Sequence, residues 1–417
     1  MRKNLDFFKH LELAPYILCF YVFNFVFNFF AQNVHLKMKT LNIFEVHSNK
    51  IMALIKDIYS VSFYQKFGQA VAEVHPTFNK QKFIEAIYEG DFAQKEWKDR
   101  MKHTTVVLHQ FMPENFPETV ALIDKIIQNL KKNNFTDGNL AFIFFADYIE
   151  KYGLDDFKTS TKAFVSITQF ISCEFAVRPF LLKYKEKMID EMAKWSLHEN
   201  HHVRRLASEG SRPRLPWAMA IPFLKKDPTS ILPILENLKK DPSEYVRRSV
   251  ANNLNDIAKD NPEIVLGIAQ RWKGINKEID AIIKHGCRTL LKQGHPEILS
   301  HYGLESTNIE LSNFEIKTPK VKIGDYLQFQ FQLNNKNNEA KTIRLEYAVH
   351  YKKSKGHLAK KVFKISEKIY QPHQVTKVER NQSFKLITTR VFHTGMHQLS
   401  IIINGTESEA LEFELVE

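Results

Sequence analysis

The segment His198-Glu-Asn-His-His-Val-Arg-Arg-Leu-Ala207 decides the fold, because it recurs further along the chain as Asp241-Pro-Ser-Glu-Tyr-Val-Arg-Arg-Ser-Val250. Aligning Val203 with Val246 gives a period of 246 − 203 = 43 residues, which lies in the range of HEAT-type helix pairs. Such pairs bury one face against their neighbours and stack into a solenoid with a long concave surface. Chance similarity of two amphipathic helices is the alternative, which the identical Val-Arg-Arg at matched positions disfavours.

Apolar residues recur at helical spacing from Asn42 to about Leu299, with clear stretches at Leu140 to Ile149 and Phe164 to Phe175. The Asp-Pro steps at 227–228 and 241–242 predict helix starts, with the carboxylate as the cap and proline as the first helical residue. Strand-like alternation is not sustained anywhere in this region. We therefore predict that all of it is helical.

Beyond Thr307 the period of the apolar residues changes from helical to two. Leu327 to Leu333 alternates apolar residues with glutamines, and Leu345 to Tyr351 repeats the alternation. About a hundred residues with six or seven short strands predict a small β-sandwich, without cysteines for an inter-sheet disulfide. The predicted fold is thus multidomain: an all-α HEAT-like solenoid over residues 38–304, then an all-β sandwich over residues 307–417.

The first 37 residues form an apolar extension whose role the sequence leaves open. Leu13 to Ala31 is long enough for a membrane span, but Pro15, Asn24 and Asn28 interrupt it. We favour Met38 as the working start of the protein. A membrane anchor and a peripheral helix are the alternatives.

Composition favours a polyanionic partner and a reducing compartment. The 417 residues carry a formal net charge of +12, although a lysine-rich surface kept for solubility would give the same value. Cys19, Cys173 and Cys287 lack paired spacing, which fits a cytoplasmic protein. His198 to His202 matches H-E-x-x-H, but this metal motif needs the middle of a helix, and a helix is predicted to begin only near Val203. We predict no catalytic metal and no cofactor.

The repeated Val-Arg-Arg places two arginines near the start of the matching helix in each unit. These residues are Arg204, Arg205, Arg247 and Arg248. A ladder of guanidinium groups suits a phosphate backbone, because each phosphate can accept a bidentate contact. The alternative is that the arginines bridge adjacent repeats through acidic residues.

Between the repeats lies a stiff, cationic loop, Glu209-Gly-Ser-Arg-Pro-Arg-Leu-Pro-Trp217. Arg212, Arg214 and Trp217 suit insertion toward a groove or stacking on a base, so we predict that they bind DNA. Trp217 as ordinary core packing is the alternative. Tyr245 is a further candidate, because its aromatic ring, like that of Trp217, can make a cation–π contact.

Three motifs resemble the AlkC branch of HEAT-like DNA glycosylases. They are Phe170-Ile-Ser-Cys-Glu-Phe-Ala-Val-Arg-Pro-Phe180, His202-Val-Arg-Arg-Leu-Ala-Ser-Glu-Gly-Ser-Arg-Pro-Arg-Leu-Pro-Trp217 and Tyr245-Val-Arg-Arg-Ser-Val-Ala-Asn-Asn-Leu-Asn-Asp256. The resemblance extends from Met38 to about Gly303, and long members of that branch end in an immunoglobulin-like domain. It implies hydrolysis of the N-glycosidic bond of cationic bases such as 3-methyladenine and 3-methylcytosine.

The resemblance also implies three catalytic carboxylates, Glu174, Glu209 and Asp256. The gaps between them, 209 − 174 = 35 and 256 − 209 = 47, are each about one repeat, so helix pairs can bring them together. For each there is a purely structural alternative: helical ion pairs of Glu174 with Arg178 and of Glu209 with Arg205, and a solvated last helical turn for Asp256.

The predicted partner is double-stranded DNA that contains alkylated bases. We expect the protein to bind it as a monomer, and we expect no membrane partner. An N3-alkylated base is already cationic and leaves without a general acid, so the carboxylates need only stabilise the oxocarbenium-like sugar and orient water. A non-enzymatic HEAT scaffold that binds nucleic acid or protein is the alternative function. It accounts for the repeat and the charge, but not for a carboxylate within an apolar run.

Overall fold

The structure of the protein is a computed structural model that describes residues 55–135, 138–386 and 391–417. Its contacts divide the chain into two units, one built on Met52–Val265 with Trp272–Gly286 and one on Leu266–Arg271 with Cys287–Glu417. The apolar stretch from Leu13 to Ala31 lies outside the described residues. Within the described part of the chain, no helix is long and apolar enough to cross a membrane.

Helices make up the described chain as far as residue 301. They are α3 (Val61–Ala72), α4 (Lys80–Tyr88), η1 (Phe92–Gln94), α5 (Trp97–His109), α6 (Phe116–Lys132), η2 (Leu140–Ile143), α7 (Phe144–Tyr152), α8 (Phe157–Ile167), α9 (Val177–Tyr184), α10 (Glu186–Trp195), α11 (His201–Gly210), α12 (Pro222–Lys226), η3 (Thr229–Ile231), α13 (Leu232–Leu238), α14 (Glu244–Ile257), α15 (Pro262–Trp272), α16 (Lys277–Gly286), α17 (Arg288–Gln293) and α18 (Pro296–His301).

Side-chain caps fix several of these helix starts. Asn200 accepts a hydrogen bond from the backbone N–H of His202 at 2.8 Å and begins α11. The prediction for the Asp-Pro steps was wrong in position, because η3 begins at Thr229 and α14 at Glu244, after the prolines. At Asp241 the carboxylate instead accepts from the N–H of Ser243 at 2.8 Å, in a turn that precedes the helix.

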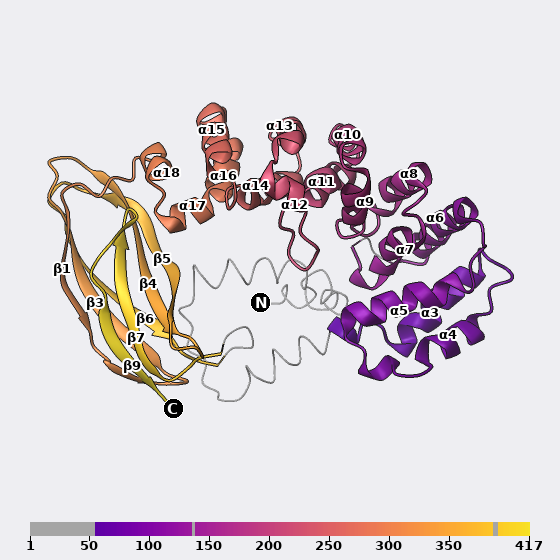
Figure 1. The fold of residues 1–417 in the computed structure, drawn as a ribbon, viewed down its shortest axis with the longest axis horizontal. Helices are drawn as coiled ribbons and strands as arrows, with labels where there is room; N and C mark the ends of the chain where they lie inside the picture. The colour runs from indigo at the N-terminus through magenta and orange to yellow at the C-terminus, as the bar shows by residue number, and fades with distance from the viewer. Residues whose placement is uncertain (1–54, 136–137, 387–390) are drawn as a thin grey trace, which may run out of the picture. The chain divides into compact units, whose positions relative to one another are not determined.

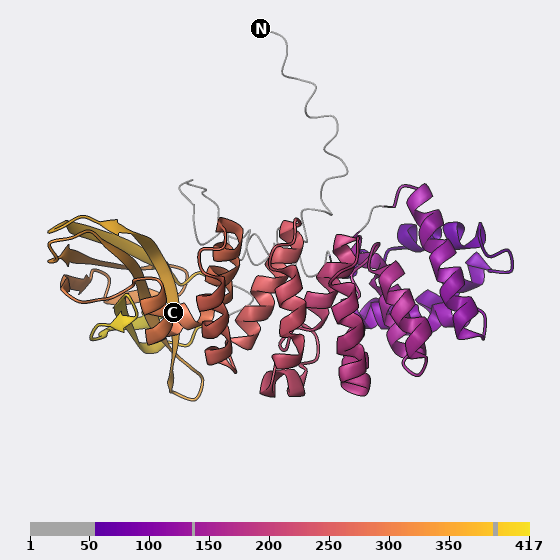
Figure 2. The ribbon, with the colours of Figure 1, turned by 90° about the horizontal axis from the view of Figure 1, so that it is seen from above.

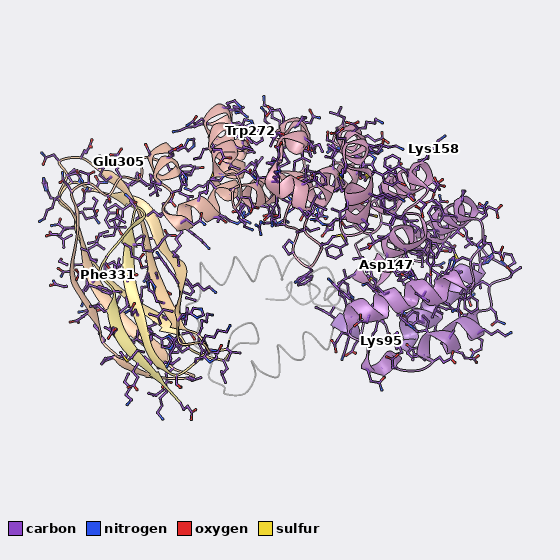
Figure 3. The ribbon with its side chains drawn as sticks, in the orientation of Figure 1. Lys95, Asp147, Lys158, Trp272, Glu305 and Phe331 are labelled. Carbon is purple, nitrogen blue, oxygen red and sulfur yellow. The ribbon has the colours of Figure 1, made fainter. Side chains whose placement is uncertain are left out.

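The helix pairs stack as the repeat predicts. Figure 1 shows α8, α10 and α13 in one row and α9, α11 and α14 in a second row beside it. The contacts agree, since α11 packs against α10, α13 and α14. Seen from above, the successive helices stand side by side (Figure 2). Trp272, labelled in Figure 3, closes α15 and donates from Nε1 to Glu236 of α13 at 2.9 Å.

The region around Glu174 differs from its predicted form. The sequence predicts a helix over Phe164 to Phe175, but α8 ends at Ile167 and residues 168–176 form turns before α9. The bends carry Glu174 to the start of α9, where its carboxylate pairs with Arg205 of α11. The spacing of apolar residues indicates where a helix can form, but a sharp turn that is itself made of apolar residues does not interrupt this spacing.

The second unit contains two β-sheets packed face to face. The strands are β1 (Ile309–Ile316), β2 (Lys320–Lys322), β3 (Tyr326–Asn335), β4 (Lys341–Lys352), β5 (Leu358–Tyr370), β6 (Val375–Ser383), β7 (Gly395–Ile403), β8 (Thr406–Glu407) and β9 (Leu411–Val416). One sheet has the order β1-β3-β6 and the other β2-β9-β7-β4-β5, with β8 beside β7. These are more strands than the six or seven predicted, chiefly because β2 and β8 are too short to show alternation.

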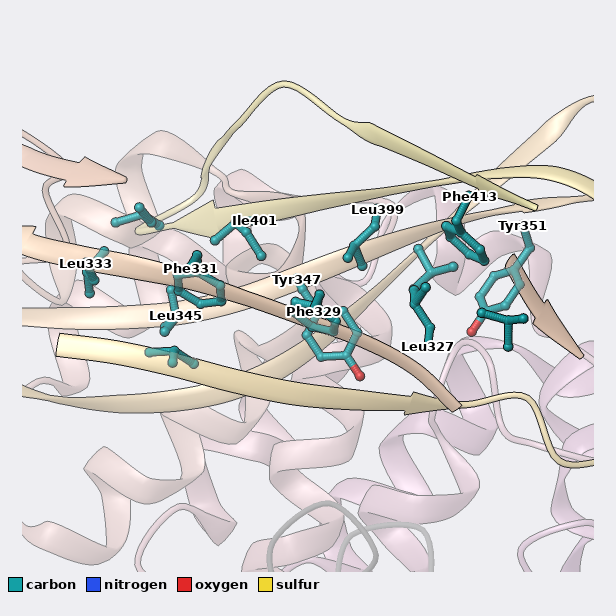
Figure 4. Packing of buried hydrophobic residues seen from close by; sticks show 14 of the residues in the cluster. Leu327, Phe329, Phe331, Leu333, Leu345, Tyr347, Tyr351, Leu399, Ile401 and Phe413 are labelled. Carbon is teal, nitrogen blue, oxygen red and sulfur yellow. The ribbon is translucent and has the colours of Figure 1, made fainter. Parts of the chain in front are cut away.

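Alternating side chains form the core of the sandwich. Leu327, Phe329, Phe331 and Leu333 of β3 are all buried and face Leu345, Tyr347 and other side chains of the second sheet (Figure 4). In β4 the intervening Glu346 and Ala348 are buried as well. The helices α17 and α18 lie in the same unit and approach this sheet, since Gly294 lies against Gly405. The second unit therefore includes two helices that the sequence assigns to the solenoid.

Candidate active site

Three buried carboxylates and two arginines form one chain of ion pairs, in the order Glu174, Arg205, Glu209, Arg212, Asp256. Glu174 lies just before α9, Glu209 in the last turn of α11 and Asp256 at the end of α14. Three successive repeats thus bring together the three carboxylates that the sequence predicts. We call these five residues the carboxylate cluster.

The first half of the cluster is centred on Arg205. Its guanidinium donates to Oε2 of Glu174 and, at 2.9 Å, to Oγ of Ser172, and Ser172 also donates to Oε2 of Glu174 at 2.7 Å. A second nitrogen of Arg205 lies 3.6 Å from Oε1 of Glu209. The guanidinium carbon sits 4.7 Å from the ring centre of Tyr245, which adds a cation–π contact.

The second half is centred on Arg212, in the loop after α11. Nη1 of Arg212 donates to Oε1 of Glu209 at 2.6 Å, and Nε donates to Oδ2 of Asp256 at 2.8 Å. The other oxygen of Asp256, Oδ1, accepts from Nζ of Lys259 at 2.9 Å. Glu174, Glu209 and Asp256 are only 9%, 5% and 1% exposed, so their charges depend on these partners.

Mutual attraction keeps Glu209 and the two arginines of the cluster ionised. Burial alone would raise the pKa of Glu209, but Arg205 and Arg212 outweigh it and lower the pKa below its ordinary value. Burial would likewise lower the pKa of Arg205, and the charges of Glu174 and Glu209 raise it instead. The same holds for Arg212 beside Glu209 and Asp256. Glu209 and the two arginines therefore offer fixed charges rather than a proton donor.

Glu174 has a carboxylate oxygen that accepts no hydrogen bond from the described residues. The hydrogen bonds to Glu174 all end on Oε2, which leaves Oε1 for a water or a substrate atom. On Glu209 both arginines lie on Oε1, so Oε2 is likewise open, but Glu174 is the more exposed of the two residues, at 9% against 5%. Glu174 is thus the member of the cluster best suited to orient a water.

Two further cations hold the loop beside the cluster. Arg178 of α9 is fully buried and donates to the backbone carbonyls of Met219, Gly210 and Arg212 at 2.6, 3.1 and 2.8 Å. Burial lowers the pKa of Arg178 to about 10. Lys98 of α5 donates to the carbonyl of Trp217, and its Nζ lies 5.7 Å from the ring centre of Phe175.

Comparison with known proteins assigns the family. The family model described as "DNA alkylation repair enzyme" matches residues 103–271, and the model of the YhaZ C-terminal Ig-like domain matches residues 310–417. The chain is 34% identical to Pseudomonas fluorescens alkylpurine DNA glycosylase AlkC, solved bound to DNA containing an abasic site analog. That match has a TM-score of 0.82 and covers 87% of this chain and 99% of the other. The chain belongs to the AlkC family of DNA glycosylases.

A curated relative agrees with this assignment. The protein YhaZ of Bacillus subtilis strain 168 is 41% identical over 365 residues, which are 87% of this chain and 100% of the relative. The chain is therefore a DNA alkylation repair glycosylase, a hydrolase, with a C-terminal immunoglobulin-like domain. The non-enzymatic scaffold that the repeat alone allowed is not supported.

The AlkC-type fold gives the predicted DNA-binding arginines different surroundings. Arg204 is bound to Asp241 in the next repeat, at 2.5 Å from Nε to Oδ2, as the bridging alternative expects. Arg247 donates to the carbonyls of Asp241 and Pro242. Arg248 has a side chain that is 51% exposed and pairs with Glu244 at 2.6 Å. Of the four repeat arginines, Arg248 is the most available to a phosphate.

The loop residues differ in the same way. Trp217 is 61% exposed, so the core-packing alternative is wrong, and its φ of 63° is left-handed. Arg214 forms a bidentate pair with Asp260, at 2.6 Å for each bond, and has a side chain that is 38% exposed. Arg212 is buried in the cluster and acts on the carboxylates rather than as an open surface cation.

The structural alternatives for the carboxylates have separate outcomes. Glu174 does not pair with Arg178, because Arg178 donates to loop carbonyls, and its arginine partner is Arg205 on another helix. The helical pair of Glu209 with Arg205 exists, at 3.6 Å. Asp256 is not solvated, since it is 1% exposed.

Four residues at the site escaped the sequence reasoning: Lys98, Ser172, Arg178 in its actual role, and Lys259. Lys259 stands three positions after Asp256, a helical spacing that could have identified it. Lys98 lies 119 positions from Trp217, and no local pattern connects them. His198 precedes the start of α11 at His201, so H-E-x-x-H is not on one helix face, and the described residues contain no group of three metal-ligating side chains.

Proposed function

We propose that this glycosylase removes cationic N3-alkylated bases, 3-methyladenine and 3-methylcytosine, from double-stranded DNA. The observation that carries this proposal is the convergence of Glu174, Glu209 and Asp256 at one buried place. Buried negative charge attracts a cationic base more than a neutral one, since Coulomb attraction strengthens as the local dielectric constant falls.

The chemistry requires little proton transfer. The C1′–N bond breaks, its electron pair goes to the already cationic base, and the base leaves neutral. The sugar becomes oxocarbenium-like and is stabilised by the carboxylates. Water adds to C1′ and loses its proton to a carboxylate or to solvent. We assign the orientation of that water to Glu174, because its Oε1 has no partner among the described residues.

The arginines of the cluster keep the carboxylates in place. Without Arg205 and Arg212, three buried like charges would repel one another and take up protons. Their guanidinium groups both lie on Oε1 of Glu209, and Arg205 binds Glu174 through Oε2, which leaves Oε1 of Glu174 open. Preorganised charge of this kind acts on the transition state without rearranging during the reaction.

We assign the DNA contacts to residues around the cluster. Arg248 and Arg214 are partly exposed cations that suit phosphates, and the exposed ring of Trp217 suits stacking or insertion beside the damaged nucleotide. Tyr245, Arg204, Arg205, Arg212 and Arg247 then act behind this layer. The DNA-bound AlkC relative supports DNA as the partner. A monomer without metal or cofactor suffices for the reaction as written.

The test is direct measurement of released bases. Duplex DNA treated with a methylating agent is incubated with the full chain, and free 3-methyladenine, 3-methylcytosine and 7-methylguanine are quantified. We expect release of the first two, with Glu174→Gln as the inactive reference. Release of 7-methylguanine alone, or no release by the folded protein, would refute the proposed substrate class.

A further inference from the structure

The two oxygens of Asp256 are neutralised by cations of different kinds. Oδ2 is held by Nε and Nη2 of Arg212, each at 2.8 Å. Oδ1 is held by Nζ of Lys259 alone, at 2.9 Å. The Asp256 and Arg212 side chains are 2% and 7% exposed, whereas that of Lys259 is 37% exposed.

This difference makes one contact fixed and the other replaceable. Arg212 is planar and buried, and it also binds Glu209, so it cannot leave without stranding charges in the interior. Lys259 is a single ammonium on a flexible four-carbon stem, one helical turn beyond Asp256 and open to solvent. Ion pairs with an exposed lysine are weak and are readily exchanged for another anion.

The surroundings of Lys259 supply a reason for the exchange. Its neighbour in the chain, Asp260, holds Arg214 in a bidentate pair, so the partners of two partly exposed cations, Asp256 and Asp260, are four residues apart in the chain. A phosphate that approaches this pair offers Lys259 a second anion, and it does so only when DNA is present.

We infer that Lys259 is a displaceable counter-ion, which leaves Asp256 for a DNA phosphate and frees Oδ1 for the sugar of the damaged nucleotide. The inference rests on the proposed role of Asp256. In the free protein Lys259 neutralises that carboxylate, and in the complex its departure removes one positive charge from beside the cluster. Lys259 is then a positioning residue, which couples phosphate binding to the exposure of the reactive carboxylate.

A double-mutant cycle tests this exchange through binding, without any excision. The dissociation constant for a duplex with a tetrahydrofuran abasic-site analogue is measured against KCl concentration for wild type, Lys259→Gln, Asp256→Asn and the double variant. We expect Lys259→Gln to reduce the slope of log K against log salt by about one. In the wild-type background Asp256→Asn should strengthen binding, because it also releases Lys259 for the phosphate. This effect should exceed the effect of Asp256→Asn in the Lys259→Gln background by about threefold or more.

Controls separate this exchange from a general loss of positive charge. Lys194 makes an ion pair of the same spacing and length, with Glu191 at 2.9 Å on α10, so Lys194→Gln should leave the salt slope unchanged. Lys259→Arg should keep the wild-type slope. An unchanged slope in Lys259→Gln, or equal effects of Asp256→Asn in both backgrounds, would overturn the inference. Because Lys259 is exposed, its single variant decides the matter even if Asp256→Asn fails to fold.

Failure of the proposed function would look different. If the wild-type protein released no methylated base, the substrate assignment would fall, whereas the binding cycle could still succeed. If excision occurred and the cycle showed no coupling, only the role of Lys259 would be wrong.

Discussion

Arg204 and Arg247 occupy the same position in successive repeats and make the same contact. Nη1 of Arg204 donates to the carbonyls of His198 and Glu199, at 2.9 and 2.6 Å, and Nη1 of Arg247 donates to those of Asp241 and Pro242, at 2.7 and 2.9 Å. In both cases the acceptors lie six and five positions earlier. The first arginine of each Val-Arg-Arg therefore closes the turn before its own helix, which is a reason for the repeat that does not involve DNA.

The second arginine of the later repeat is the one we expect to bind a phosphate. Arg248→Ala should weaken binding to any duplex and lower the salt slope by about one, because its exposed side chain gives up only a surface pair with Glu244. The melting temperature of Arg248→Ala should stay close to that of the wild-type protein. Arg247→Ala serves as the control, and should lower the melting temperature while leaving the salt slope unchanged. The reverse pattern would exchange the two roles.

The carboxylates should act on the chemical step. Glu174→Gln, Glu209→Gln and Asp256→Asn each remove one charge with little change of shape, and single-turnover excision should slow by roughly a hundredfold or more. Asp241→Asn is a matched control, since Asp241 is also buried and bound to an arginine, Arg204, but lies outside the cluster.

We expect Asp241→Asn to lower the melting temperature and to excise at nearly the wild-type rate. Single-turnover rates and melting temperatures for all four variants decide the matter. If the three cluster variants also excised normally and lost only stability, the carboxylates would be structural ion-pair partners.

The resemblance to the AlkC branch implied the three carboxylates, and their gaps, each close to one repeat length, indicated that successive helix pairs could bring them together. The sequence did not predict that Arg205 joins Glu174 to Glu209, since the turns of residues 168–176 decide where Glu174 points. Turns built from apolar residues leave no trace in a helical period. The shared guanidinium could be identified only once the three repeats were assembled in space.

The end of the solenoid could not be found in the same way. α17 and α18 carry a helical pattern like the helices before them, yet they belong to the unit of the β-sandwich. Periodicity indicates that a helix has a buried face, and not which surface covers it. The alternation in β3, by contrast, predicted its core residues correctly, because one face of that strand is more exposed than the other.

Packing of α17 and α18 on the sheet can be tested at a glycine. A Cβ at Gly405 would lie 2.3 Å from Cδ1 of Leu299 and 3.0 Å from Cα of Gly294. Gly405→Ala should therefore destabilise the protein more than Gly356→Ala, which has a similar φ, 82° against 80°, but open space around it. The difference should be about 1–3 kcal/mol in the free energy of unfolding, measured with denaturant. Equal losses would mean that α17 and α18 move aside without cost.

Trp217 should contribute to DNA binding and should lower the stability of the folded protein. Its φ of 63° costs a non-glycine residue about 1–2 kcal/mol, and Lys98 and Arg178 hold the loop on either side. Trp217→Gly should be at least as stable as Trp217→Ala, because only glycine relieves this strain. Both should bind lesion-containing DNA more weakly than wild type, in a titration with fluorescent duplex. Normal affinity in both would exclude the ring from DNA binding.

Glu150 on α7 should make stability depend on pH. Burial raises the pKa of Glu150 from 4.5 to about 7. The charge of Asp147 on the same helix (Figure 3) adds to this increase, and Lys102 opposes it. A carboxyl whose pKa is higher in the folded state contributes stability that is full below pH 4.5 and is lost as the pH rises through 7. Replacing it by Gln removes this loss.

Glu150→Gln should therefore gain stability over wild type between pH 5 and pH 8, by up to about 3 kcal/mol. Glu114→Gln, at an exposed position, is the control and should follow the wild-type curve. Unfolding free energies at the two pH values provide the measurement, and parallel curves for wild type and Glu150→Gln would mean that this carboxyl is already well solvated in the folded protein.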